Sequence, residues 1–302
     1  MRLTGKVKRL LPKQIYDGFV SLGIEKILLD IYRKKAGRSI VKNYINSTDP
    51  EKREVAEWIK ENGLTTFPYS YKFKYDWKTI DVYHDDDGYP YVLHLGKKLF
   101  FRKDMTNDSV KKLYVEMRAE QDIESPHCYV QKKDHEPTNG CIIAEIGAME
   151  ASFTLEWIER CKKAYLFECE SAWMEPLRRT FAPWSDRVEV ISKYVGSGGS
   201  KDETVQLDDF FHNKEVTLIK ADIEGAEIDM LDGGEKTFST KIKQAYICTY
   251  HRWNHPELIK QKLEAYGLQT EFNRRYMFLV TSPSEFEKCT WRRGIIYAER
   301  ID

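Results

Sequence analysis

Several features that define other protein classes are missing from this sequence of 302 residues. Its six cysteines include no C-x-x-C pair, so the spacing typical of structural zinc sites is absent, and the scattered thiols fit a reducing compartment. No apolar run approaches the ~20 residues that a membrane-spanning helix needs. The N-terminus also lacks the apolar core of a signal peptide. We therefore expect a cytoplasmic protein without disulfides or a transmembrane segment.

An excess of charge of either sign is also missing. The chain has 48 Lys and Arg against 48 Asp and Glu, so its formal net charge is zero and no overall field attracts it to nucleic acid. Hydrophobic residues make up 41% of the chain, which is enough for a packed core. The composition therefore predicts a globular protein that does not bind nucleic acid.

What the sequence does contain is a strand–turn–helix–strand pattern between Cys141 and Glu168. A short apolar run, 141–144, predicts a buried strand, and a turn with Gly147 follows it. Apolar residues then recur at helical spacing from Phe153. A second apolar run ends on Glu168. Such a βαβ unit binds its ligand at the carboxyl ends of its strands.

The residue types at these strand ends indicate the ligand. Gly147 and Ala148 allow a ligand to approach the backbone closely, and Glu168 can accept hydrogen bonds from the two hydroxyls of a ribose. Glu145 adds negative charge, which suits a cationic ligand better than a pyrophosphate. Because the fingerprint G-x-G-x-x-G is absent, S-adenosylmethionine fits better than NAD. The alternative is a purely structural βαβ unit with ordinary surface carboxylates.

Strands and helices continue to alternate after Glu168. Further strands are expected at 188–191, 216–221, 244–249, about 269–280 and 294–300, with helices at 172–181, near 228–231 and at 256–266. This order predicts a doubly wound α/β sheet. The glycine-rich segment 196–200 is a candidate for a mobile loop over the site.

The first 130 residues differ from this pattern and are expected to form an N-terminal α+β extension, with the α/β domain over 131–302. Helices are predicted at 24–31, 49–62 and 108–119, and a small antiparallel meander from Phe67, with a first strand over 69–75 and a turn at 85–88. The basic side of the first helix either docks on an acidic membrane surface or a phosphorylated substrate, or solvates the outer face of a helix that packs on the catalytic domain. We favour packing.

The fourth strand and its continuation read V-T-L-I-K-A-D-I-E-G-A-E, which resembles the hallmark of FkbM-type S-adenosylmethionine-dependent methyltransferases. The segments E-I-G-A, F-E-C-E, Y-H-R and G-I-I-Y-A-E are similar to other motifs of that family, and together they cover roughly 141–300. E-Q-D-I-E-S-P-H-C-Y resembles a stretch ahead of the core in some relatives. Met149 stands where the family usually has Asn, and Ala151 where it has a second glycine.

The resemblance implies a seven-stranded Rossmann-like methyltransferase sheet with S-adenosyl-L-methionine at the ends of its first two strands. The implied cofactor-binding residues are Glu145, Gly147, Ala148, Met149, Phe153, Glu168, Cys169, Gln121, His127 and Asp222.

Asp222 and His251 follow the fourth and fifth strands, which are neighbours in this topology. We expect this pair to be catalytic because an acceptor hydroxyl needs a base, with Glu224 and Tyr250 as supporting residues. Alternatively, the two carboxylates only cap the following helix, and the histidine is structural. A divalent metal held by Asp222, Glu224 and His251 is conceivable, but a metal-free site is favoured.

The function expected is therefore an O-methyltransferase acting on a sugar hydroxyl of a nucleotide-linked, polysaccharide or glycolipid precursor. The alternative is a non-catalytic binding protein on a degenerate methyltransferase scaffold. Nucleic-acid methylation is disfavoured because the N/D-P-P-Y/F motif of base methyltransferases is absent. The partners expected are a small-molecule or glycan acceptor and further copies of the chain in a homo-oligomer. Peripheral contact of the basic helix with a membrane is a further possibility.

Overall fold

The computed structural model describes residues 24–198, 203–279 and 291–301. By packing, the chain divides into two units. The first unit takes the chain up to Lys72 together with 274–293, and the second takes 73–273 together with the residues from Gly294 onward. The domain boundary expected at residue 130 stays a prediction.

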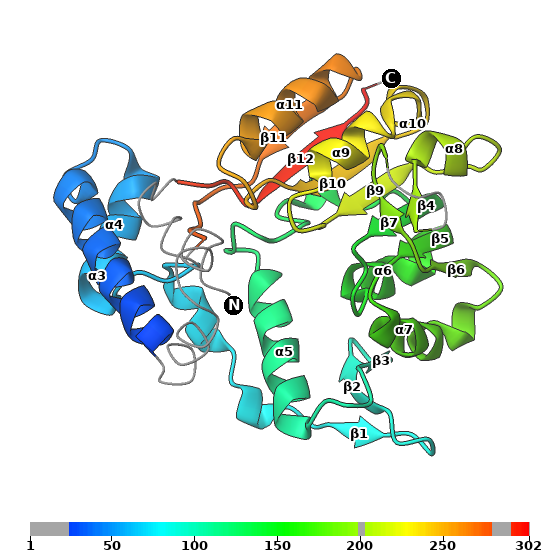
Figure 1. The fold of residues 1–302 in the computed structure, drawn as a ribbon, viewed down its shortest axis with the longest axis horizontal. Coiled ribbons are helices and arrows are strands. Elements are labelled where there is room, and N and C mark those ends of the chain that lie inside the picture. The colour runs from blue at the N-terminus through cyan, green and yellow to red at the C-terminus, as the bar shows by residue number, and fades with distance from the viewer. Residues whose placement is uncertain (1–23, 199–202, 280–290, 302) are drawn as a thin grey trace, which may run out of the picture. The chain divides into compact units, whose positions relative to one another are not determined.

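The second unit is built on a seven-stranded sheet in the order β11-β12-β10-β9-β4-β5-β6 (Figure 1). Its strands are β4 (Cys141–Ile146), β5 (Cys161–Phe167), β6 (Val188–Ile191), β9 (Leu218–Ala221), β10 (Gln244–Cys248), β11 (Gln269–Phe272) and β12 (Ile295–Glu299). β12 is antiparallel to both of its neighbours, and the remaining pairs are parallel. The predicted seven-stranded α/β sheet is confirmed.

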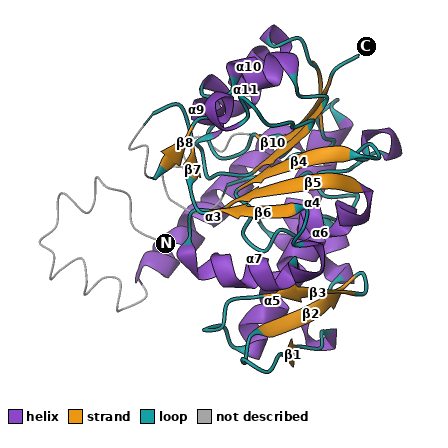
Figure 2. Ribbon diagram, turned by 90° about the vertical axis from the view of Figure 1, so that its right-hand side faces the viewer, coloured by secondary structure: helices purple, strands orange, loops and turns teal. Residues whose placement is uncertain are grey.

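Helices cover both faces of this sheet (Figure 2). One face packs against α8 (Leu207–Phe210), α9 (Glu227–Asp232), α10 (Glu235–Thr240) and α11 (His255–Ala265). On the other side lie α5 (Asn107–Glu120), α6 (Ser152–Trp157) and α7 (Met174–Thr180). Alternation along the strands divides the side chains between the faces: Ile142 and Ala144 pack toward α9 and α11, whereas Ile143 packs toward α6. The sheet is therefore buried on both sides, as the apolar strands predict.

Two smaller sheets accompany the large one. β1 (Tyr83–His84), β2 (Pro90–His94) and β3 (Lys97–Phe100) form the expected antiparallel meander, and β2 and β3 pack with α5 and α7. β7 (Tyr194–Val195) pairs with β8 (Thr204–Val205), and the glycine-rich segment runs between them, in part outside the described residues. In the aspartate-rich turn of the meander, Asp85 and Asp87 pair with Arg179 of α7.

The strand expected over 69–75 is wrong. Residues Ser70–Lys74 form a 3-10 helix instead. The alternating aromatics suggested one buried face, but Tyr69 and Tyr71 are buried while Phe73 is 69% exposed. Tyr69 uses its hydroxyl to bind the backbone of Tyr276, a contact that fixes the turn and that no local pattern could indicate. Tertiary contacts here override strand propensity.

In the first unit, α3 (Ile24–Tyr44) packs against α4 (Pro50–Asn62). Ala36 and Ile40 of α3 are buried with Val55 and Ile59 of α4, so the basic helix has a packed face, and the partner on that face is α4 of the first unit. Packing on the catalytic domain stays a prediction. The start of the chain, through residue 23, lies outside the described residues, and with it much of the basic segment. Among the described helices, none combines the length and the apolar character that crossing a bilayer would take.

Candidate functional site

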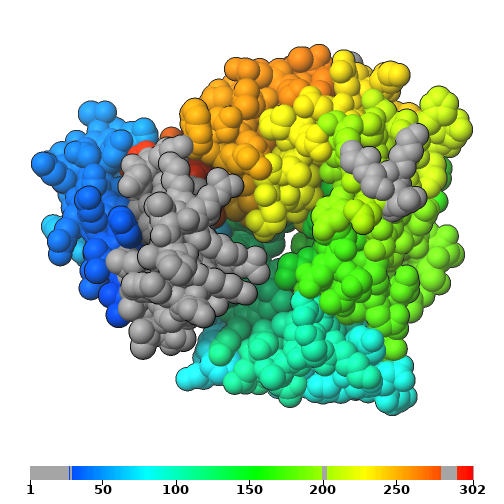
Figure 3. All heavy atoms as spheres, in the orientation of Figure 1, coloured from blue at the N-terminus to red at the C-terminus, as the bar shows by residue number. Residues whose placement is uncertain are grey.

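A cavity of about 570 Å³ opens at the carboxyl ends of β4, β5 and β9. The space-filling view shows this hollow where the green, yellow and teal parts of the second unit meet (Figure 3). Its walls come from the strand ends, from α5 and from the segment after α5. All of the residues that the resemblance assigns to cofactor binding line it: Gln121, His127, Glu145, Gly147, Ala148, Met149, Phe153, Glu168, Cys169 and Asp222.

Gly147 directly follows β4, and the structure gives a reason for a glycine at this position that the sequence did not indicate. Its φ is +74°, and a Cβ built on it would lie 1.9 Å from the backbone oxygen of Asp222. A side chain at this position would therefore force the ends of β4 and β9 apart. The glycine is needed by the close approach of two strand ends, in addition to any ligand that passes over them.

Glu168 ends β5, and its carboxylate holds the turn after β4. One oxygen accepts the N–H of Met149 at 2.8 Å, and the other accepts the N–H of Glu170 at 2.7 Å. Met149 has a φ of +49°, so this hydrogen bond supports a left-handed residue that would otherwise be unfavourable. Each carboxylate oxygen can accept two hydrogen bonds, so Glu168 keeps acceptor capacity toward the cavity.

Glu145 and Lys220 face each other across β4 and β9 and form a buried ion pair of 3.2 Å. Glu145 also accepts the N–H of Thr154 at 3.0 Å, which caps α6 in place of the missing N-cap side chain. Lys220 donates to the oxygen of Gly147 at 3.2 Å. Burial lowers the pKa of Lys220, but the charges of Glu145, Asp222 and other nearby groups together outweigh that effect, and the net shift is upward. Glu145 therefore has a structural role, because it links β4 to β9 and to the start of α6.

Asp222 follows β9 and is the centre of the polar wall of the cavity. One carboxylate oxygen accepts a hydrogen bond of 3.1 Å from the hydroxyl of Tyr129 and lies 3.5 Å from Nε2 of His127. The other lies 3.4 Å from the hydroxyl of Tyr250 and 3.4 Å from Nε2 of His251. Burial alone would raise the pKa of Asp222. The hydrogen bond and charge of His127, with the charges of Lys220 and His251, hold that pKa well below its usual range.

His251 does not line the cavity, although the sequence paired it with Asp222. Alternation along β10 and its extension explains this: Tyr250 shares the cavity face with Cys248, so His251 points toward α9. There its Nδ1 lies 2.8 Å from Glu227, whose second oxygen lies 3.1 Å from Nδ1 of His255. Its Nε2 keeps the contact with Asp222, so the ring joins the cavity wall to a buried carboxylate.

Glu227 is fully buried and accepts contacts from both histidines. Burial would raise its pKa, but hydrogen bonds from His251 and His255 lower that pKa to about 2. Burial likewise opposes protonation of His251, yet its bond to Glu227 raises the pKa of the imidazole. Glu224, the other carboxylate assigned from the sequence, is 93% exposed at its side chain and lies 3.7 Å from His251.

Four residues of this network were not assigned from the sequence: Tyr129, Lys220, Glu227 and His255. Two of them lie in segments that carry the resemblance to the FkbM family: Tyr129 in E-Q-D-I-E-S-P-H-C-Y and Glu227 in A-D-I-E-G-A-E. Lys220 could have been found by register, because it is two residues before Asp222 and shares its face. His255 lies at the start of α11, and nothing local marks it.

Residues 141–279 match the methyltransferase FkbM domain. A curated protein of Jannaschia sp. (strain CCS1), named "Putative methyltransferase", is 34% identical over 87 residues, which cover 28% of this chain and 31% of that protein.

Solved structures with similar folds include the methyltransferase FkbM from Methylobacillus flagellatus KT, with a TM-score of 0.44, 16% identity, and coverage of 66% of this chain and 56% of that one. A precorrin-6y C5,15-methyltransferase from Geobacter metallireducens GS-15 has a TM-score of 0.37 and 12% identity, covering 55% and 84%. The family match includes the strand ends that line the cavity, and S-adenosylmethionine is the cofactor it implies. Over residues 141–279, this chain is therefore similar to the methyltransferase FkbM domain.

Proposed function

We propose that this protein transfers the methyl group of S-adenosylmethionine to a hydroxyl oxygen of a sugar, in a polysaccharide, glycolipid or nucleotide-linked precursor. The observation that supports this most directly is the pairing of two carboxylates across one cavity. Glu168 lies at the end of β5, where a ribose would bind, and Asp222 lies at the end of β9 with two tyrosines and two histidines around it.

The residues at the β4 and β5 ends fit this cofactor. The turn at Gly147 and Ala148 leaves only backbone and a methyl group beside the cavity, and Glu168 keeps acceptor capacity for ribose hydroxyls. Bound there, the cofactor supplies an activated methyl group on a sulfonium. The protein's part is to bind it, to orient the acceptor oxygen in line with the methyl carbon and to exclude water.

A hydroxyl acceptor must also lose a proton as the new bond forms. Asp222 is suited to accept a hydrogen bond from that hydroxyl, but its lowered pKa makes it a poor final holder of the proton. His251 is better suited, since its Nε2 lies 3.4 Å from Asp222 and Glu227 stabilises the charged imidazolium. Tyr250 and Tyr129 hold the carboxylate in place, and Glu224 stands at the exposed rim.

We assign the acceptor side of the cavity to α5, which supplies Leu113, Met117, Glu116 and Glu120. This mixture of apolar and hydrogen-bonding groups suits a hydroxyl-rich ring, which has both an apolar face and polar edges. Specificity for a sugar acceptor is part of the proposal. So is the homo-oligomer expected from the sequence.

The first test is a calorimetric titration of S-adenosylmethionine and S-adenosylhomocysteine into the wild type, Glu168→Gln and Glu168→Ala. We expect the wild type to bind both, Glu168→Gln to bind about tenfold or more weakly because a ribose contact is impaired, and Glu168→Ala to be weaker still. Glu175→Gln, a surface change on α7, is the matched control and should bind like the wild type. A screen of sugar acceptors with labelled cofactor follows.

Absence of binding to the wild type would contradict the enzyme proposal and favour the alternative from the sequence, a binding protein on a degenerate scaffold. Met149 is the residue that raises this alternative, since the FkbM motif usually has Asn there. Its backbone nonetheless adopts the left-handed conformation that Asn favours, at φ +49°. Met149→Asn should therefore restore binding if the site has only lost that one contact.

A further inference from the structure

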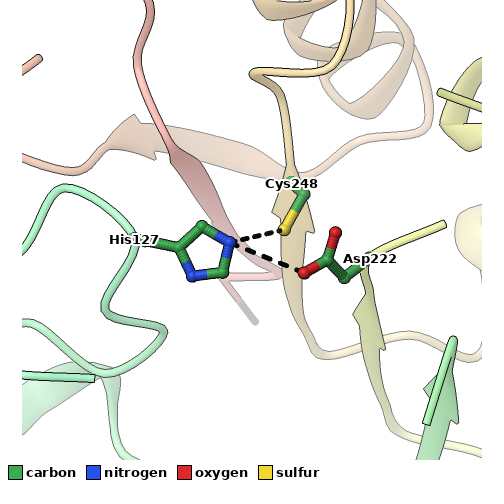
Figure 4. Close-up of side chains that lie close together, drawn as sticks. All are labelled: His127, Asp222 and Cys248. Carbon is green, nitrogen blue, oxygen red and sulfur yellow. Dashed lines mark hydrogen bonds and ion pairs between the residues drawn. The ribbon is translucent and has the colours of Figure 1, made fainter. Parts of the chain in front are cut away.

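Four metal-ligating atoms that the proposed methyl transfer does not require together lie close to one another. His127, Tyr129 and Asp222 line the cavity, and Cys248 is buried beside them. Nε2 of His127 lies 3.5 Å from the carboxylate of Asp222 and 3.7 Å from Sγ of Cys248. Figure 4 shows that this one ring nitrogen faces both groups. The hydroxyl of Tyr129 lies 3.1 Å from the same carboxylate oxygen and 3.8 Å from the same sulfur.

The topology of the sheet explains why these groups converge. Asp222 follows β9 and Cys248 ends β10, the neighbouring strand, and both side chains point to the cavity face. His127 and Tyr129 are two residues apart in the segment that covers this face, so both can reach the same point. His127 and Cys248 are buried. The strand pair β9 and β10 therefore fixes the positions of Asp222 and Cys248, and the segment that covers them fixes those of His127 and Tyr129.

We infer that His127, Asp222 and Cys248 form a binding site for a divalent transition metal of the zinc type, with the hydroxyl of Tyr129 beside the fourth position. Zinc bonds of about 2.3 Å to sulfur and about 2.0 Å to nitrogen or oxygen, at tetrahedral angles, separate N from S by about 3.5 Å and N from O by about 3.3 Å. The distances of 3.7 and 3.5 Å agree with this geometry.

Charge and ligand chemistry also favour such an ion. Binding releases the proton of the Cys248 thiol and the proton on Nε2 of His127, and the thiolate with the Asp222 carboxylate then balances the two positive charges. A buried sulfur together with an imidazole selects zinc or cobalt over magnesium or calcium, which prefer oxygen ligands. The nearby ammonium of Lys220 is already paired with Glu145.

A second set of groups, Asp222, Glu227 and His251, is close enough to bind an ion but has the wrong geometry. His251 faces Asp222 with Nε2 and Glu227 with Nδ1, the opposite side of the ring. One ion cannot be bound by both carboxylates and this ring at once. Hydrogen bonding accounts for that set, and the metal site is confined to the side of Asp222 that faces His127.

The test is cobalt titration of chelator-treated, untagged protein, followed by absorption spectroscopy. We expect one equivalent of Co²⁺ to produce the thiolate charge-transfer band and the visible bands of tetrahedral cobalt, and Zn²⁺ to abolish them by displacement. Cys248→Ser should lose the charge-transfer band, and His127→Gln should bind cobalt at least tenfold more weakly. Cys161→Ser is the matched control: it replaces a buried cysteine outside the cluster and should keep the bands.

Thermal unfolding of each variant identifies any that fail to fold, and His127→Gln or Asp222→Asn then serves in place of Cys248→Ser. Absence of the charge-transfer band at stoichiometric cobalt, or an unchanged band in Cys248→Ser, would overturn the inference. Because the readout is a spectrum of the protein and cobalt alone, it is independent of cofactor binding and of methyl transfer.

Discussion

At the scale of single residues, the most informative contact is the one that sequence reasoning did not include. Asp222 and His251 were expected to be supported by Glu224 and Tyr250, but His251 also contacts the buried Glu227, which in turn contacts His255. Glu227 fixes which ring nitrogen of His251 carries the proton when the ring is neutral, because Nδ1 faces its carboxylate. It acts as a positioning residue for the proposed proton acceptor.

Replacing Glu227 with Gln should lower the pKa of His251. Glu227 raises that pKa through its hydrogen bond and charge, so the imidazole of Glu227→Gln should lose its proton at lower pH than that of the wild type. The measurement is an NMR titration of labelled histidine, with His251→Asn to assign the resonance. Glu224→Gln is the control, since Glu224 is 93% exposed and its charge is screened by solvent, so its effect should be smaller. Equal shifts in both variants would contradict the positioning role.

The same carboxylate should affect stability in acid. The pKa of Glu227 is lowered from its ordinary 4.5 to about 2, so the ionised form stabilises the fold above pH ~4.5 and that contribution is lost as pH falls toward 2. For His251, whose folded pKa is raised, the contribution is present below its unfolded pKa and is lost as pH rises through the folded value. The two groups thus stabilise the fold most in mildly acidic solution.

At the scale of secondary structure, the ion pair between β4 and β9 joins two strands and a helix. Glu145→Gln or Lys220→Met alone should lower the free energy of unfolding by about 3–5 kcal/mol, because each leaves a buried charge without its partner. The double variant should be about 2 kcal/mol or more closer to the wild type than the sum of the single losses. Urea denaturation of all four proteins measures this coupling.

The pair Lys162–Glu215 provides the control for this cycle. It is also an ion pair, at 3.7 Å, but its side chains are 71% and 77% exposed, so its coupling should stay below about 1 kcal/mol. Coupling of similar size in the two pairs would mean that burial of Glu145 and Lys220 adds nothing.

Most elements could be predicted from the sequence because their patterns are local. The strand at 188–191 and the helix at 49–62 coincide with observed elements, since apolar runs and capping residues mark them. The closing strand expected over 269–280 is shorter, at Gln269–Phe272, because the chain then enters the first unit. The cavity-facing residues were predictable from strand ends. The Glu227–His255 contact was not, since it joins two helices that only the fold brings together.

At the scale of the whole molecule, the chain leaves the second unit after Asn273 and returns to it at Gly294. The segment between them belongs to the first unit, where Glu51 binds Arg293 and the backbone N–H of Arg275. Each unit has its own hydrophobic cluster. The free energy of local unfolding should therefore differ between the first unit and the second.

Tyr69→Phe should loosen the first unit selectively. The hydroxyl of Tyr69 donates to the oxygen of Tyr276 and accepts from its nitrogen, so its loss leaves two polar backbone groups unpaired, at a cost of about 1–3 kcal/mol. Hydrogen exchange should accelerate in α3 and α4 and stay unchanged in β4 and β9. Tyr246→Phe, which removes a buried hydroxyl contact with His135 in the second unit, should give the reverse pattern. Uniform acceleration in both variants would indicate a single cooperative unit.

The position of β12 has a consequence for biosynthesis. This strand lies between β10 and β11, although it is made after both of them. While the ribosome is still translating the segment before Gly294, β10 and β11 have no strand between them, and one edge of β10 is open to pairing with other chains. The methyltransferase sheet can therefore close only after residues 295–299 have emerged from the exit tunnel, and a nascent chain that stalls earlier would depend on chaperones to keep that edge from aggregating.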